Sequence, residues 1–337
     1  MGAFHVDLHR VGFAHLYRLP ALGEKNMCGI AGLIHRGRKA DIGAEMTSML
    51  QAMKHRGPDS TGFALYGEPK DRETVMRIKF AEREDLNSGF AMREKINGRR
   101  LEVKHRLESS GAKLVSEQAA TDYAHRFVFS FSGDLRKLAD YLEDVEGVEI
   151  LSIGRGLELI KDLGDASDVA GRYSIESFSG THAIGHTRMA TESDVDIRSA
   201  HPYWAYPFQD ISVVHNGQLT NYWTMRRTLE KRGHRFVSNC DSEFIAVYLA
   251  DQIDHNSNLE EAMHRSVKEL DGVFTYLVAT GNQLGMAKDT MAAKPMVLYE
   301  SKDLIALASE EGAIRSIFPQ EIDTCDPYDG EVRVWQA

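Results

Sequence analysis

Short apolar runs of strand length alternate along the chain with longer segments whose apolar residues recur at helical spacing. Residues 28–34 form one such run, and Met46, Met49 and Met53 then mark one face of a helix. The predicted strands are 28–34, 61–66, 127–131, 148–153, 183–187, 211–215, 273–280, 283–288, 296–299, 304–308 and 331–335, and the predicted helices are 42–54, 135–142, 157–163, 221–232, 241–253 and 258–270.

Strands and helices arrive in blocks and not in regular alternation. Blocks favour layered α+β architecture over a repeated βαβ unit. Residues 67–125 are polar and have no clear period, and we expect residues 67–178 to be an insertion on the main fold. With 337 residues, the chain is long enough to bury a sizeable core without disulfide or metal support.

Composition narrows the classes of function. The net charge of −10 argues against nucleic acid as the main partner, because phosphate binding needs clustered Lys and Arg. The three cysteines show no CxxC spacing, which fits neither a disulfide framework nor a zinc site and favours a reducing cytoplasm. No run approaches the ~18 apolar residues of a membrane span, and residues 1–26 lack the apolar stretch of a secretory signal.

Cys28 directly follows Met27 at the head of an apolar run. A cysteine in that place can become the first residue of the mature chain, and its own α-amine, with a pKa of roughly 7.7–8.0, can then activate the thiol. Such a nucleophile needs no separate catalytic histidine. On its own, this cysteine fits a buried structural role better than a catalytic one.

Downstream motifs change that balance. They are Met-Cys-Gly-Ile-Ala-Gly at 27–32, His-Arg-Gly-Pro-Asp-Ser at 55–60, Gly-His-Thr-Arg-Met-Ala-Thr at 185–191, His-Pro at 201–202, His-Asn-Gly at 215–217 and Asp-Ser-Glu at 241–243, with weaker echoes at 288–289, 294–295 and 308–310. Their set and order resemble the class II glutamine amidotransferases, the group with an N-terminal nucleophile, over residues 27–310.

The resemblance implies a role for each motif in glutamine hydrolysis. An arginine can grip the α-carboxylate of glutamine in bidentate fashion and an aspartate can accept from its ammonium; the family gives these roles to the residues at the positions of Arg188 and Asp241. Besides the nucleophile Cys28, the implied residues are Asn216 and Gly217 for the oxyanion hole, Arg188, Asp241, Thr191 and Gly217 for the substrate, and Arg56, Asp59 and His201 in support.

Four points stay open at this level. Asn216-Gly217 is also a strong signal for a hairpin turn, and the motif at 55–60 also fits a turn that ends a helix. Glu192 stands where several family members have histidine. Residues 1–27 are expected to be absent from the mature enzyme, either because translation starts at Met27 or because a propeptide is cleaved, which leaves 28–337 as the amidotransferase domain.

The resemblance further implies the four-layer αββα sandwich of N-terminal-nucleophile hydrolases. The expected reaction is hydrolysis of L-glutamine through a Cys28 thioester, with ammonia passed to a separate synthase subunit of the glutamate-synthase or N-methylglutamate-synthase type. We expect no metal and no cofactor in this chain, and a flavin and an iron–sulfur cluster on the partner. A stand-alone amidase for another amide and a non-catalytic glutamine-sensing subunit are the alternatives.

Overall fold

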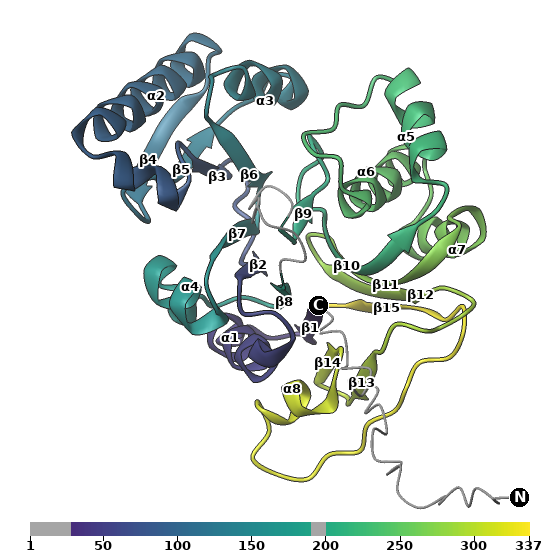
Figure 1. Cartoon of the computed structure of the whole chain (residues 1–337). Coiled ribbons are helices and arrows are strands. Elements are labelled where there is room, and N and C mark those ends of the chain that lie inside the picture. The colour runs from purple at the N-terminus through teal and green to yellow at the C-terminus, as the bar shows by residue number, and fades with distance from the viewer. Residues whose placement is uncertain (1–27, 190–199) are drawn as a thin grey trace, which may run out of the picture.

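A computed structural model describes residues 28–189 and 200–337, in which two antiparallel sheets face each other and helices cover their outer sides (Figure 1). A third sheet with its own two helices is attached at one flank. The predictions for residues 1–27, and those for Thr191 and Glu192, lie outside the described residues.

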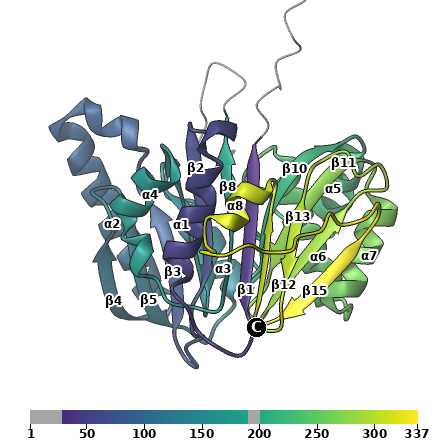
Figure 2. The ribbon, with the colours of Figure 1, turned by 90° about the horizontal axis from the view of Figure 1, so that it is seen from below.

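The first sheet has six strands in the order β13-β14-β1-β8-β2-β7, so β1 lies in its interior. Helices α1, α4 and α8 cover its outer face, as Figure 2 shows. Its strands are β1 (Gly29–His35), β2 (Ser60–Tyr66), β7 (Leu157–Leu163), β8 (His182–Arg188), β13 (Val297–Glu300) and β14 (Leu304–Ala308). The helical segments on this side are α1 (Ile42–Ala52), η1 (Lys54–Arg56), α4 (Ala166–Tyr173), η3 (Ile175–Ser177) and α8 (Glu311–Arg315).

The second sheet has five strands in the order β15-β12-β11-β10-β9. Helices α6 and α7 pack on its outer face, and α5 packs on α6. The strands are β9 (Tyr203–Trp204), β10 (Ser212–Leu219), β11 (Gly272–Ala279), β12 (Gln283–Lys288) and β15 (Val332–Gln336), and the helices are α5 (Tyr222–Lys231), α6 (Asp241–Asp254) and α7 (Leu259–Glu269).

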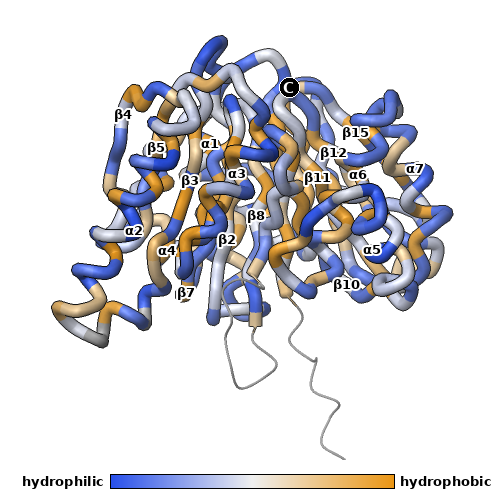
Figure 3. The backbone as a smooth tube through the Cα atoms, turned by 90° about the horizontal axis from the view of Figure 1, so that it is seen from above, coloured by the Kyte–Doolittle hydropathy of each residue, from blue (hydrophilic) through white to orange (hydrophobic). Residues whose placement is uncertain are grey.

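The inner faces of the two sheets pack together through β1 and β8 of the first and β10 and β11 of the second. Leu277 of β11 belongs to the same buried cluster as Ile30 and Leu33 of β1. In Figure 3 the apolar stretches lie mainly in the interior of the molecule, among the packed strands. At one end of the seam, Tyr66 donates to Ala279 O at 2.8 Å and its hydroxyl lies 2.7 Å from Ser212 Oγ. The predicted four-layer α+β sandwich is therefore confirmed.

The third sheet, in the order β4-β5-β3-β6, is built from residues inside the 67–178 range. Helix α2 packs on β4 and on α3, and α3 packs on β6. Its strands are β3 (Thr74–Lys79), β4 (Lys113–Ala119), β5 (Ala124–Ser130) and β6 (Glu149–Gly154), and its helices are η2 (Arg83–Ser88), α2 (Phe90–Ser109) and α3 (Leu135–Glu143). That residues 67–178 are an insertion remains a prediction.

The expectation of a helix over residues 157–163 is wrong, because this segment is strand β7 and pairs with β2 over its whole length. Its polar residues point to ionic partners. Glu158 lies 2.7 Å from Arg77 of β3, and Lys161 lies 3.0 Å from Glu149 of β6. These buried pairs attach the third sheet to the first. Within the described residues, no helix is long and apolar enough to cross a membrane.

Candidate active site

Cys28 lies immediately before β1, the strand between β14 and β8 in the first sheet. All seven residues of β1 are buried, which fixes the position of the cysteine that precedes them. Cys28 itself is half-buried, has a free thiol and lines a hollow of about 750 Å³. The nucleophile chosen from the sequence is therefore accessible to a small molecule.

Asn216 reaches Cys28, the predicted nucleophile, from the opposite sheet. Its side-chain Nδ2 donates to the backbone oxygen of Cys28 at 2.8 Å, and the residue is 8% exposed. Asn216 and Gly217 lie within β10, paired with Thr275 and Phe274 of β11, so the alternative of a hairpin turn is wrong. The pairing with β11 continues through Gly217 to Leu219. Gly217 has a φ of 142°, which a glycine adopts easily because it has no side chain.

Arg188 and Asp241 line the same hollow from two further elements, the end of β8 and the first residue of α6. Asp241 accepts from the backbone N–H of Leu219 at 3.0 Å, and its other oxygen lies 3.6 Å from His215 Nδ1. Burial raises the pKa of the Asp241 carboxyl, but the nearby His215 ring and the bond from Leu219 N–H outweigh it, and the pKa lies below its usual range. The hollow thus offers both a cation and an ionised carboxylate.

Three buried histidines form the inner wall of the hollow. The rings of His186 and His201 are 4.2 Å apart, and those of His201 and His215 are 6.4 Å apart. Burial, with a smaller contribution from the charge of Arg188, lowers the pKa of His186 to about 3, and burial also lowers the pKa of His201 well below its usual range. The lowered pKa values keep the rings of His186 and His201 neutral at pH 7.

The histidine wall does not amount to a metal site. Among the described residues, no three His, Cys, Asp or Glu side chains are grouped so that they could hold a metal ion.

Arg56 and Asp59 do not line the hollow, but their loop lies against the backbone of Arg188. The N–H of Asp59 donates to Arg188 O at 3.1 Å, and a side chain on Gly57 would meet Arg188 C at 2.4 Å. Arg56 Nη1 donates to Glu310 at 3.2 Å. The motif at 55–60 therefore supports Arg188 from behind, and the 3₁₀ turn η1 that precedes Gly57 also fits the alternative of a helix-ending turn.

The structure also places residues in the hollow that the sequence did not single out. Trp223 of α5 stands at its rim and is 55% exposed, and Tyr222 lies beside it. Cys240 caps α6 next to Asp241, with its Sγ 3.8 Å from His201 Nε2. In the sequence, the signal for Trp223 was its place close to the His-Asn-Gly motif at 215–217, whereas nothing marked Cys240.

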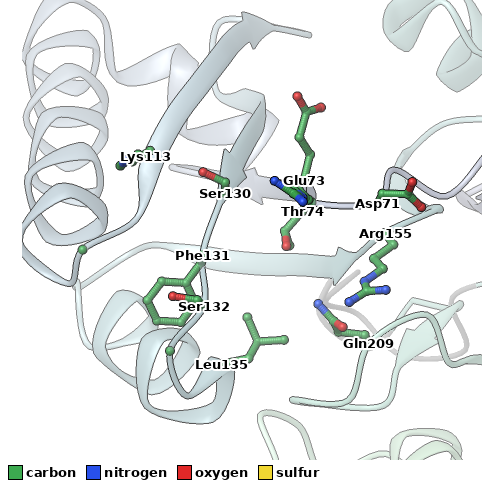
Figure 4. Close-up of a pocket in the computed structure, with 13 residues that line it drawn as sticks. Asp71, Glu73, Thr74, Lys113, Ser130, Phe131, Ser132, Leu135, Arg155 and Gln209 are labelled. Atoms are coloured by element: carbon green, nitrogen blue, oxygen red, sulfur yellow. The ribbon is translucent and has the colours of Figure 1, made fainter.

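A second hollow of about 770 Å³ lies on the third sheet and shares no residue with the first. Figure 4 shows Lys113, Ser130 and Phe131 around it, with Arg155 and Gln209 side by side at its other end. It lacks Cys28 and every other residue predicted for catalysis, so its slightly larger volume does not make it the candidate site.

Comparisons with known proteins bear on the same residues. A family model described as "Glutamine amidotransferase domain" matches residues 186–316. The chain is 39% identical over 319 residues to a Methanothermobacter thermautotrophicus protein named "Putative glutamine amidotransferase", and the match covers 92% of this chain and 100% of that protein. It is 33% identical over 291 residues to "Glutamine amidotransferase-like protein GlxB" of Rhizobium meliloti, covering 86% of this chain and 91% of the relative.

Among solved structures, the glutamine phosphoribosylpyrophosphate amidotransferase of B. subtilis aligns with a TM-score of 0.56 at 15% identity. The alignment covers 91% of this chain and 47% of that one, so the chain spans about half the length of the solved protein. At this identity the likeness concerns the fold alone, and it agrees with the layered arrangement of the two facing sheets.

Proposed function

Because this chain belongs to the class II glutamine amidotransferases, we propose that it hydrolyses L-glutamine to L-glutamate and ammonia with Cys28 as the nucleophile. The observation that carries the proposal is the 2.8 Å bond from Asn216 Nδ2 to Cys28 O, made across the two sheets at the hollow that Arg188 and Asp241 also line. The amide donor lies beside a half-buried thiol, and Arg188 and Asp241 can bind the two charged groups of an amino acid. This arrangement suits hydrolysis of a γ-amide.

Substrate recognition rests on two charges in this proposal. Arg188 binds the α-carboxylate of glutamine, and Asp241 accepts from the α-ammonium while its pKa stays below the usual range. The sequence also predicts Thr191 for the substrate. A plain amide carries neither the carboxylate nor the ammonium, so it would make neither of these two interactions and would bind more weakly. The site is therefore expected to discriminate against simple acyl amides.

The chemical steps use the α-amine of Cys28 as the base. The amine takes the thiol proton, the sulfur attacks the side-chain carbonyl carbon, and Asn216 Nδ2 and the Gly217 N–H stabilise the oxyanion. The C–N bond then breaks and the proton leaves with ammonia, and water hydrolyses the thioester. This base exists only where the peptide bond between Met27 and Cys28 is absent, because an amide nitrogen is not basic.

Replacement of the nucleophile tests the proposal. Protein that starts at residue 28, verified by intact mass, should lose ammonia release by at least about 10⁴-fold on Cys28→Ala. Glutamine binding, measured by calorimetry, should persist because Arg188 and Asp241 remain.

The control variant is Cys325→Ala, since Cys325 is an exposed free thiol that does not line the hollow. Full hydrolysis by the Cys28 variant, or turnover by a chain with the 27–28 bond intact, would refute the mechanism.

We further propose that a separate synthase subunit of the glutamate-synthase or N-methylglutamate-synthase type accepts the ammonia, and that any flavin or iron–sulfur cluster belongs to that subunit. Co-purification from the native cell, followed by a glutamine-dependent synthase assay, tests the pairing. A glutaminase that works at full rate alone on asparagine or acyl amides would favour a stand-alone amidase, and glutamine binding without ammonia release would favour a sensor.

A further inference from the structure

The dipeptide Ser309-Glu310 follows β14 directly and has no role in the chemistry proposed above. Ser309 is 3% exposed, and β14 is the neighbour of β1, so this serine lies beside the nucleophile strand. It is also within hydrogen-bond distance of Asn216 on the facing sheet. One buried hydroxyl thus touches both sheets at the point where the proposed site is assembled.

The hydrogen bonds of this hydroxyl can be accounted for one by one. A serine hydroxyl has one hydrogen to donate and two lone pairs that accept. The Ile30 N–H donates to Ser309 Oγ at 3.0 Å, and Asn216 Nδ2 donates to it at 3.3 Å. The hydroxyl hydrogen is directed to Ile30 O at 3.4 Å. Every position on the hydroxyl is therefore used, and towards Asn216 it can only accept.

The second neighbour of Asn216 Nδ2 imposes the same demand. The backbone oxygen of Cys28, 2.8 Å away, has no hydrogen and can only accept. An Asn216 amide turned by 180° would set its oxygen against two acceptors, and a buried acceptor without a donor is costly. Both contacts therefore require the NH₂ group, and not the oxygen, to face the nucleophile.

We propose that Ser309 is a positioning residue that holds the Asn216 amide with its NH₂ group towards the reacting carbonyl. The inference rests on the oxyanion role proposed for Asn216. One N–H stays on Ser309 and fixes the plane of the amide, while the other, which here meets Cys28 O, is presented to the oxyanion as it forms. Because the amide is already oriented, this N–H only has to exchange Cys28 O for the oxyanion in the transition state.

The test is a double-mutant cycle on glutamine hydrolysis. Asn216→Ala alone should lower kcat by roughly 10²–10³-fold, as expected for loss of an oxyanion donor. Ser309→Ala alone should lower kcat by about 10-fold and leave KM unchanged, because Ser309 does not line the hollow. In the Asn216→Ala background, Ser309→Ala should have less than about a twofold effect, since the group that it orients is gone.

Ser301→Ala is the matched control. This serine makes comparable bonds, accepting from Leu304 N at 3.0 Å and donating to Leu304 O at 2.9 Å, and it lies at the end of β14 opposite to Ser309. It should leave kcat unchanged. If Ser309→Ala fails to fold by circular dichroism, Ser309→Cys replaces it in the cycle, because sulfur is a weak acceptor, and the same loss of kcat is expected.

The outcomes distinguish the positioning role of Ser309 from the proposed glutamine hydrolysis on which it rests. An equal loss from the Ser309 variant in both backgrounds would mean that Ser309 acts through β1 and not through Asn216, which overturns the inference alone. Unchanged kcat in the single Ser309 variant does the same. Full kcat in Asn216→Ala would instead remove the oxyanion role on which both rest.

Discussion

Gly217 shows how a single residue limits the site. Its φ of 142° is one that L side chains rarely adopt, and a Cβ would lie 2.0 Å from Val273 O on the neighbouring strand. Any side chain would therefore push β10 away from β11 at the point where Asn216 donates to Cys28 O and Gly217 lines the hollow. This glycine is needed for geometry, whatever the chemistry of its neighbours.

We expect Gly217→Ala to lower kcat for glutamine hydrolysis by roughly 10²-fold or more, because the shifted backbone removes oxyanion donors from their positions. Steady-state kinetics at saturating glutamine measures the loss. Gly98→Ala is the control, since Gly98 lies in α2 with nothing within 4 Å of an added Cβ. A Gly217 variant with unchanged kcat would show that β10 can absorb the side chain.

At this scale the sequence predicted much of the site. Cys28, Arg188, Asn216 and Asp241 could be chosen because each stands in a short motif of fixed order, and the structure brings all four to one hollow. The assignment of their roles remains a prediction. Cys240 could not be chosen, because its place beside His201 depends on how α6 meets the second sheet and on no local pattern.

At the scale of elements, Leu157–Leu163 shows where periodicity misleads. Its polar residues recur three apart, which imitates one face of a helix, yet the segment is a buried strand. The cause is tertiary: Glu158 and Lys161 are satisfied by Arg77, Arg126 and Glu149 of the third sheet, which no reading of the segment alone can supply. The strands around 183–187 and 273–288, whose surroundings are apolar, were predicted to within a few residues.

The turn between β6 and β7 depends on one carboxylate from a distant loop. Asp210 accepts from three successive backbone N–H groups, those of Arg155, Gly156 and Leu157, at 3.0, 2.9 and 2.8 Å. Its own φ is 54°, a left-handed conformation that costs free energy for a residue with a side chain. The bonds to the turn offset that cost and tie the third sheet to the loop before β10.

Asp210→Ala should lower the free energy of unfolding by about 3 kcal/mol, since it removes three charge-assisted bonds and keeps an unfavourable φ. Asp210→Asn should cost only about 1 kcal/mol, because its Oδ1 can still accept from Gly156 and Leu157. Urea unfolding measures both. Asp303→Ala, an exposed aspartate, serves as control, and an equal effect of all three substitutions would contradict the role given to the turn.

For the whole molecule, buried neutral histidines couple stability to pH. Burial lowers the pKa of His182 to about 4 and that of His186 to about 3, whereas both would titrate near 6.5 in the unfolded chain. Below pH 6.5 the unfolded state therefore binds protons that the native state refuses. The stability that the neutral His182 and His186 rings contribute is fully present above pH 6.5, and it is lost as the pH falls towards 4 for His182 and 3 for His186.

We expect the free energy of unfolding to fall between pH 6.5 and 4.5, with each of these two histidines contributing up to about 1.4 kcal/mol per pH unit. Urea titrations at a series of pH values measure the slope. His186→Gln should reduce this slope by about 1.4 kcal/mol per pH unit, the contribution of one proton. His264→Gln, at an exposed position, should leave the slope unchanged. A flat profile in wild-type protein over that interval would rule out neutral burial of these rings.

The bond between Asn216 and Cys28 has a consequence for how the protein can be followed in solution. The proposed oxyanion donor and the proposed nucleophile lie in opposite sheets of the sandwich, so turnover requires the two sheets to be in register, whereas the backbone hydrogen bonds lie within each sheet. The catalytic rate therefore reports how well the two facing sheets are aligned. An agent that displaces one sheet relative to the other, and leaves the hydrogen bonds within each sheet intact, would lower the catalytic rate without changing the far-ultraviolet circular dichroism spectrum.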